Sequence, residues 1–175
     1  GISSTTALSF TSKDTVKPYL TSTVPAHLAT DIATNANIVL NFSETVVAQS
    51  GGHYITIFNK SDDSEFEKID VTNAKVSGSG TNQITINPGT NFVEKSIYYI
   101  KIDATAFDDS SGNSYGGISG TNKYKFTIVD STNPTLSTSS PTDGATNVNT
   151  LSSLVLTFDE DIDAETGGEI YLYKS

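Results

Sequence analysis

The stretch Ile38-Val-Leu-Asn-Phe-Ser-Glu44 returns later in the chain as Leu154-Val-Leu-Thr-Phe-Asp-Glu160, at an offset of 116 residues. In both stretches apolar side chains occupy alternate positions, a period of two that is typical of a half-buried β-strand. A glutamate closes each stretch. A strand that returns at a fixed offset indicates a repeated domain.

The same offset places other segments of the sequence over one another. Residues 1–11 match residues 117–127 at six of eleven positions, and Asp14 and Pro18 match Asp130 and Pro134. After one deletion, residues 55–58 also match residues 170–173. We therefore expect a tandem repeat with a period of about 116 residues.

The repeat divides the chain into three parts. Residues 1–13 are predicted to be the last strand of a preceding repeat, residues 17–129 one complete domain, and residues 133–175 the opening part of a following repeat. The two partial repeats would expose unpaired strand edges, which proteins normally cover. We expect either a longer polypeptide or pairing between the edges of adjacent chains to complete them.

Within residues 17–129, several segments alternate between apolar and polar side chains. Clusters of turn-forming residues separate them, as at 77–80 and 108–113. About seven short strands with regular turns predict an all-β chain with an immunoglobulin-like β-sandwich. The side chains expected to face the core are Ile38, Leu40, Phe42, Ile55, Ile57, Tyr98, Ile100, Phe126 and Ile128.

Composition excludes several classes of function. The net charge at pH 7 is −10, the pI is about 4.4, and the sequence contains no Cys and no Arg. A nucleic-acid partner is not expected, because binding to phosphates needs many Lys and Arg side chains. Disulfides and thiolate metal sites are ruled out. No apolar run approaches the roughly 20 residues of a membrane-spanning helix. These features favour a secreted protein at the cell surface.

Longer stretches of the sequence resemble a known family. Pro134-Thr-Leu, then Pro141-Thr-Asp-Gly-Ala-Thr-Asn-Val148, precede the strand at 154–160. This order resembles the opening of bacterial Ig-like domains of the S-layer type, and residues 98–113 resemble the closing third of such a domain. The resemblance implies a place in an S-layer protein, a large adhesin or a secreted enzyme that uses the domain as a spacer. At one turn the first copy departs from the pattern, with His27-Leu28 where the second has Asp143-Gly144.

Oxygen-bearing side chains from distant parts of the sequence are expected to meet at one end of the sandwich. Glu44 follows the strand predicted at 37–43, and Asp14 precedes the domain. The segment before the last strand carries Asp103, Asp108, Asp109 and Asn113. Ca²⁺ takes six to eight oxygen ligands, which carboxylates and backbone carbonyls supply. We expect a Ca²⁺ site at the junction with the preceding domain, repeated through Asp130 and Glu160. The alternative is an Asx-turn between Asp109 and Asn113.

Catalysis is not expected from this chain. Its two histidines, His27 and His53, have Asp143 and Glu169 as their counterparts in the second copy. A nucleophilic triad needs a histidine beside a nucleophile and an orienting acid. We read both histidines as exposed turn or strand-edge residues. The acidic run at 159–163 departs from the EF-hand pattern and is interpreted mainly as a solvated loop.

The sequence therefore favours a non-catalytic structural segment, a spacer or lattice material, of a secreted bacterial cell-surface or S-layer-type protein. Its expected partners are neighbouring Ig-like repeats of the same or adjacent chains. One alternative is a surface adhesin module that binds a glycan or protein, with Tyr115, Tyr171 and Tyr173 as stacking platforms. Another is an accessory domain of a secreted hydrolase.

Overall fold

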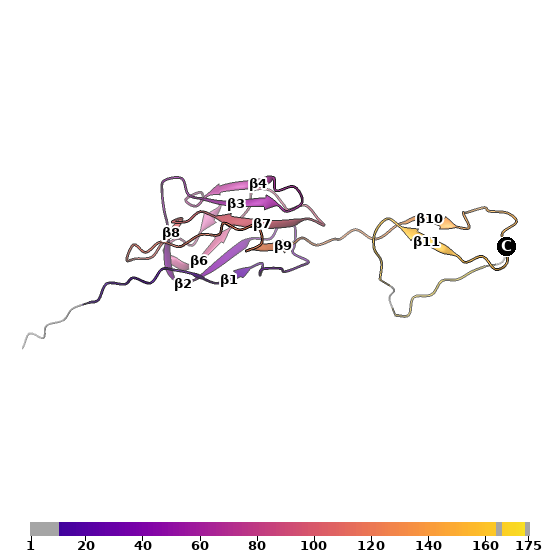
Figure 1. Ribbon diagram of the computed structural model, residues 1–175, viewed down its shortest axis with the longest axis horizontal. Coiled ribbons are helices and arrows are strands. Elements are labelled where there is room, and N and C mark those ends of the chain that lie inside the picture. The colour runs from indigo at the N-terminus through magenta and orange to yellow at the C-terminus, as the bar shows by residue number, and fades with distance from the viewer. Residues whose placement is uncertain (1–10, 164–165, 174–175) are drawn as a thin grey trace, which may run out of the picture. The chain divides into compact units, whose positions relative to one another are not determined.

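The computed structural model describes residues 11–163 and 166–173. The chain divides into two compact units, residues 1–130 (unit 1) and residues 131–175 (unit 2). Figure 1 shows strands in both. Among the described residues there is no helix, and consequently none that could cross a membrane. The all-β prediction is confirmed.

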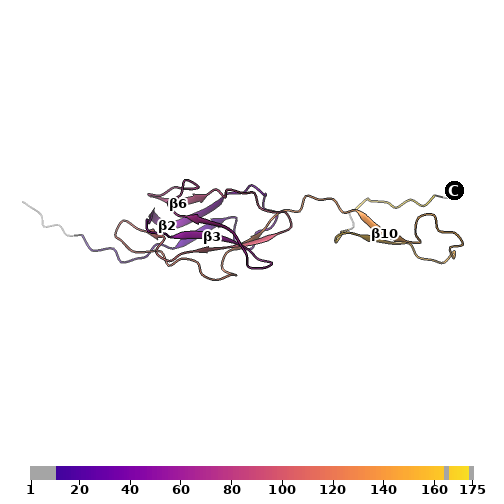
Figure 2. The same ribbon diagram turned by 90° about the horizontal axis from the view of Figure 1, so that it is seen from above.

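Unit 1 contains two antiparallel sheets. The first has the order β1–β2–β6–β5, with β8 pairing the far end of β2. Its strands are β1 (Leu20–Val24), β2 (Ile38–Ala48), β5 (Val76–Ser77), β6 (Thr81–Ile86) and β8 (Phe107–Asp108). The second has the order β4–β3–β7–β9, made of β3 (Tyr54–Asn59), β4 (Glu65–Asp70), β7 (Ile97–Ile102) and β9 (Lys125–Thr127). Figure 1 shows β3, β4 and β7 above β1, β2 and β6, and Figure 2 shows the same strands from above.

The hydrophobic core lies between these sheets. All nine side chains predicted to face inward are buried, with exposed fractions of 0–2%. Aromatic rings fill much of the space: Phe42 packs against Phe107 and Tyr115, with ring centroids 5.4 Å and 5.2 Å away. Because each sheet contributes alternate residues of its strands, the alternation in the sequence translates directly into a two-layer sandwich.

The second strand is longer than predicted. The sequence suggested a strand at 37–43 followed by Glu44, but β2 extends to Ala48 and Glu44 lies within it. Its pairing with β6 is interrupted between Asn41 and Val46 and resumes at Val46, and Val47 and Ala48 pair with β8. The alternation breaks at Ser43-Glu44-Thr45, which is why the sequence pattern alone ended the strand too early.

The described part of unit 2 contains one hairpin, β10 (Leu136–Ser140) paired with β11 (Val155–Phe158). Its register reproduces that of β1 and β2. Leu20 faces Phe42 and Leu136 faces Phe158, and a register shift follows immediately in each hairpin. Every paired position of the second hairpin lies 116 residues after its counterpart in the first.

The turn at His27-Leu28 and the turn at Asp143-Gly144, 116 residues later, have similar backbone conformations. Leu28 has a φ of 67° and Gly144, its counterpart, has a φ of 72°. Asp31 and Asn147 both have a φ of 58°. Glycine takes this left-handed conformation readily, whereas leucine does so at a steric cost. The departure at His27-Leu28 therefore changes the side chain but not the turn.

The prediction that residues 1–13 form a last strand falls mostly outside the described residues. Only residues 11–13 of that segment are described, and they belong to no strand. The division into a complete domain at 17–129 and an opening part at 133–175 stays a prediction.

Candidate metal site

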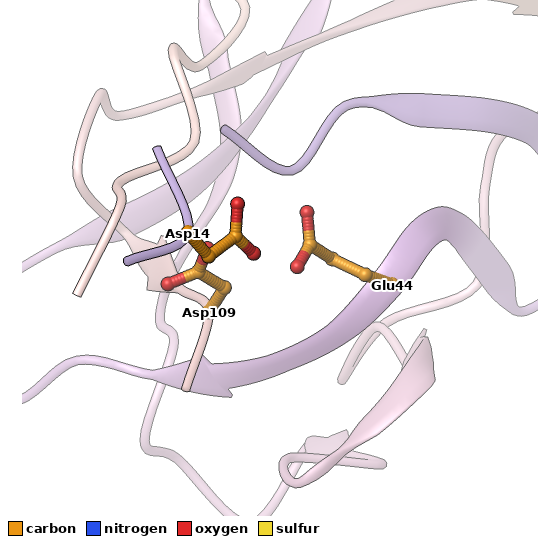
Figure 3. Close-up of side chains that lie close together, drawn as sticks. All are labelled: Asp14, Glu44 and Asp109. Atoms are coloured by element: carbon orange, nitrogen blue, oxygen red, sulfur yellow. The ribbon is translucent and has the colours of Figure 1, made fainter. Parts of the chain in front are cut away.

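Three carboxylates from separate parts of unit 1 converge in the structure. Asp14 lies in the N-terminal segment, Glu44 in β2 and Asp109 just after β8. Each residue offers one carboxylate oxygen, and these three oxygens all lie within 4.8 Å of one another. Figure 3 shows the three side chains directed toward a common space. We call Asp14, Glu44 and Asp109 the acidic cluster.

Asp109 is held rigidly by the loop that follows it. Its Oδ1 accepts hydrogen bonds from the backbone N–H groups of Ser111 and Asn113, at 2.8 Å and 2.7 Å. Its Oδ2 accepts a bond of 2.7 Å from Nδ2 of Asn113. The side chain is only 6% exposed. The Asx-turn considered as an alternative is thus present, and it fixes Asp109 within the cluster.

Asn113 also connects this loop to the N-terminal segment. Its Nδ2 donates to the backbone oxygen of Asp14 at 3.3 Å, across 99 residues of sequence. Asp14 in turn accepts a bond of 2.9 Å from the backbone N–H of Val16. Asn113 was predicted as a metal ligand. In the structure its amide nitrogen donates hydrogen bonds to both Asp14 and Asp109 and so positions these two residues.

The pKa values of Glu44 and Asp109 are shifted in opposite directions. Partial desolvation, and then the negative charges of Asp109 and Asp14, raise the pKa of the Glu44 carboxyl. For Asp109, desolvation acts to raise the pKa, but the hydrogen bonds from Asn113 and Ser111 outweigh it and lower the pKa. A negatively charged Asp109 therefore lies beside a glutamate that resists ionisation. A cation among these oxygens would relieve that repulsion.

The arrangement suits a hard divalent cation. Carboxylate oxygens are the ligands that Ca²⁺ prefers, and six to eight are needed. The acidic cluster supplies three carboxylates, so backbone carbonyls or water would complete the coordination. With no Cys in the chain and no histidine in the cluster, the donor set is all oxygen. Such a set disfavours the softer transition metals.

Two other predicted ligands lie outside the acidic cluster. Asp103 binds β3 instead: its Oδ2 accepts a bond of 2.9 Å from the backbone N–H of Tyr54. Asp108 belongs to β8 and pairs with Val47. Its Oδ1 is buried and has no hydrogen-bond partner among the described residues. Neither belongs to the group of mutually close carboxylates.

The predicted recurrence of the site involves Asp130 and Glu160. Asp130 pairs with Lys95, whose Nζ lies 2.9 Å from its Oδ2. Sequence reasoning missed this lysine, because nothing in the pattern around residue 95 connects it with the linker. Glu160 follows β11 in unit 2 and is half-buried. Metal binding by these two residues stays a prediction.

The tyrosines considered as sugar platforms differ in exposure. Tyr115 is only 7% exposed and packs edge-on against Phe42, so its ring is not available as a stacking platform. Tyr171 and Tyr173 are 67% and 88% exposed. Tyr173 aligns with Phe58, whose ring stacks on Tyr99 at 5.0 Å in unit 1. Phe58, the counterpart of Tyr173, therefore has a packing role in unit 1.

Comparison with known proteins identifies the family. The family model described as a bacterial Ig-like domain matches residues 14–128 and 130–174. The chain belongs to this family. No curated protein matches the sequence. Solved structures of low identity are also similar to part of this chain, each with a TM-score below 0.5.

Three such structures illustrate the likeness. CopC from Methylosinus trichosporium OB3b has 16% identity and a TM-score of 0.44, with 66% of this chain and 97% of that chain covered. The copper resistance protein PcoC from Escherichia coli has 23% identity and a TM-score of 0.41, covering 63% and 98%. The S-layer protein rSbsC(31-844) has 15% identity and a TM-score of 0.41, covering 70% and 15%.

Proposed function

We propose that this bacterial Ig-like chain is a non-catalytic structural segment, a spacer or lattice material, of a secreted cell-surface or S-layer-type protein. In this role tandem domains set distance and stiffness, and each domain buries its own core. Ca²⁺ bound by the acidic cluster would fasten the N-terminal segment to the body of unit 1 and so limit bending where one domain joins the next.

The tandem arrangement is supported by sequence and structure together. The two family matches begin at residues 14 and 130. These starting points are 116 residues apart, which equals the offset of the repeat. The hairpins β1–β2 and β10–β11 share their register and the position of their register shift at that same offset. A backbone bond also recurs, from Ser43 N to Tyr19 O in unit 1 and from Asp159 N to Thr135 O in unit 2.

The convergence of Asp14 with Glu44 and Asp109 is the observation that carries the calcium proposal. Asp14 lies six residues before β1, and its segment is joined to the sandwich through Asn113. A cation ligated by all three carboxylates would act as a cross-link between the N-terminal segment and two elements of the domain. Such a cross-link restricts segments that otherwise move independently.

Thermal unfolding with and without calcium tests this function. A ligand that binds only the folded state raises the unfolding midpoint. At a calcium concentration about tenfold above its dissociation constant, we expect the midpoint of unit 1 to rise by about 5 °C relative to EDTA. Magnesium should give a smaller rise, because it holds its water more tightly than calcium does.

Two variants make the measurement specific. Asp14→Asn removes one carboxylate of the acidic cluster and should abolish most of the calcium effect. Glu65→Gln removes an exposed glutamate of β4, outside the cluster, and should keep the full effect. Equal midpoints in calcium and EDTA for the natural chain would show that the cluster is not a calcium site.

A further inference from the structure

Unit 2 carries an apolar sheet face that its described residues leave open. Leu154, Ile162 and Ile170 are 43%, 49% and 74% exposed. Together with Leu156 and Phe158 they line a hollow of about 490 Å³. We call these five residues the open face. Contiguous apolar surface of this kind is unusual on a folded domain and marks a place where another element packs.

Unit 1 shows what covers the same face. The counterparts of the open face at the repeat offset, with the one-residue deletion before Ile170, are Ile38, Leu40, Phe42, Val46 and Ile55. All five are buried, with exposed fractions of 0–2%. They belong to one core cluster with Tyr98, Ile100 and Phe126 of the second sheet. Four of the five lie on β2, and Ile55 lies in β3 of the second sheet. The sheet that holds β3, β7 and β9 therefore closes the β2 face in unit 1.

The surroundings of Phe158 differ from those of Phe42, its counterpart in unit 1. In unit 1 its counterpart Phe42 is enclosed by the rings of Phe107 and Tyr115. Both of those rings come from the chain between β7 and β9. In the described part of unit 2, β10 and β11 are the only strands, so no counterpart of the segment that carries these two rings lies over Phe158.

We propose that the open face is a docking surface for the closing half of a bacterial Ig-like domain, a β-sheet with the apolar pattern of β7 and β9. The occupant is fixed by the matching register of the two hairpins, because that register places the same apolar positions on the same face. This inference rests on the tandem arrangement in the proposed function and is independent of calcium binding.

The test extends the full chain with its own closing half. Residue 175 aligns with residue 60, so residues 61–129 are appended directly after residue 175. We expect a second cooperative unfolding transition, absent from the natural chain. We also expect amide exchange at Leu156 to slow by about 100-fold or more, as it does where strands become part of a folded core.

A matched pair of variants in the extended chain locates the contact. Leu156→Asp places a charge on the open face and should abolish the second transition while the first remains. Thr157→Asp changes the neighbouring residue, which points to the other side of β11, and should leave both transitions. An extended chain with a single transition and unchanged exchange at Leu156 would overturn the proposal.

The competing occupant is a second copy of the chain, and sedimentation of the unextended chain distinguishes it. The proposal predicts a monomer over the micromolar range. A dimer that Leu156→Asp converts to monomer would show that the open face binds a second copy of the chain, which would overturn the proposal. The calcium response of unit 1, read in the same samples, reports separately on the proposed function.

Discussion

At the scale of single residues, Glu44 is the member of the acidic cluster most sensitive to charge. It occupies the irregular stretch of β2, where pairing with β6 is interrupted and the side chain faces Asp14 and Asp109. Desolvation and these two neighbours raise the pKa of its carboxyl. The folded state therefore holds a proton on Glu44 more tightly than the unfolded state does.

This shift has a definite sign for stability. A carboxyl whose pKa is raised on folding contributes stability at low pH, and that contribution is lost as the pH rises through the raised pKa. In EDTA at pH 7, Glu44→Gln should consequently unfold at a higher temperature than the natural chain, because the repulsion is removed. The difference should shrink as the pH is lowered toward 4.

Calcium should reverse the order of the two proteins. With calcium present, the natural chain gains stability from the ion and Glu44→Gln gains little. Thermal melts at pH 7 and pH 4, each with EDTA and with calcium, check both effects. A Glu44→Gln variant that is less stable than the natural chain in EDTA at pH 7 would contradict the electrostatic account.

At the scale of elements, β2 is the strand on which the sandwich depends. It pairs with β1, β6 and β8, and its inward side chains reach the aromatic rings of the opposite sheet and of the chain after β7. Phe42 is 2% exposed and contacts two of these rings. Its side chain thus joins parts of unit 1 that are far apart in sequence.

Truncating this side chain should be costly. Phe42→Ala removes a large buried ring and leaves a cavity, so we expect it to lower the free energy of unfolding of unit 1 by about 3–5 kcal/mol. Val93→Ala is the control: Val93 is 60% exposed, and its loss should change the free energy by about 0.5 kcal/mol or less. Urea unfolding measures both. Equal stability of the two variants would contradict the assignment of Phe42 to the core.

The elements that the sequence predicted well are those with a local signal. Alternation over residues 38–42, and between Tyr98 and Ile100, placed these side chains in the core correctly, because the period of two is a property of the strand itself. The convergence of Asp14, Glu44 and Asp109 was also predicted, since strand order fixes which loops meet at one end.

What the sequence did not predict are contacts that no local pattern encodes. Asp103 bonds to Tyr54 N because β3 and β7 are neighbours in a particular register. Tyr115 is buried because its loop folds back onto Phe42. The length of β2 was underestimated because its last two residues, Val47 and Ala48, pair with β8, a two-residue strand with no recognisable alternation. Each depends on how distant segments pack.

At the scale of the whole molecule, charge and repetition point to the same role. A net charge of −10 keeps like surfaces apart and attracts divalent cations, and the acidic cluster gathers part of that charge beside the N-terminal segment. In the proposed function, a repeated domain with a cation at its junction would form an extended structure whose stiffness depends on calcium.

The position of the ion tests this account most directly. We expect a crystal grown in millimolar calcium to show one ion in unit 1, about 2.3–2.6 Å from an oxygen of each of Asp14, Glu44 and Asp109, which is the usual range for calcium and oxygen. Anomalous scattering distinguishes calcium from water. Well-ordered side chains of the acidic cluster with no ion among them, in crystals saturated with calcium, would contradict the central claim.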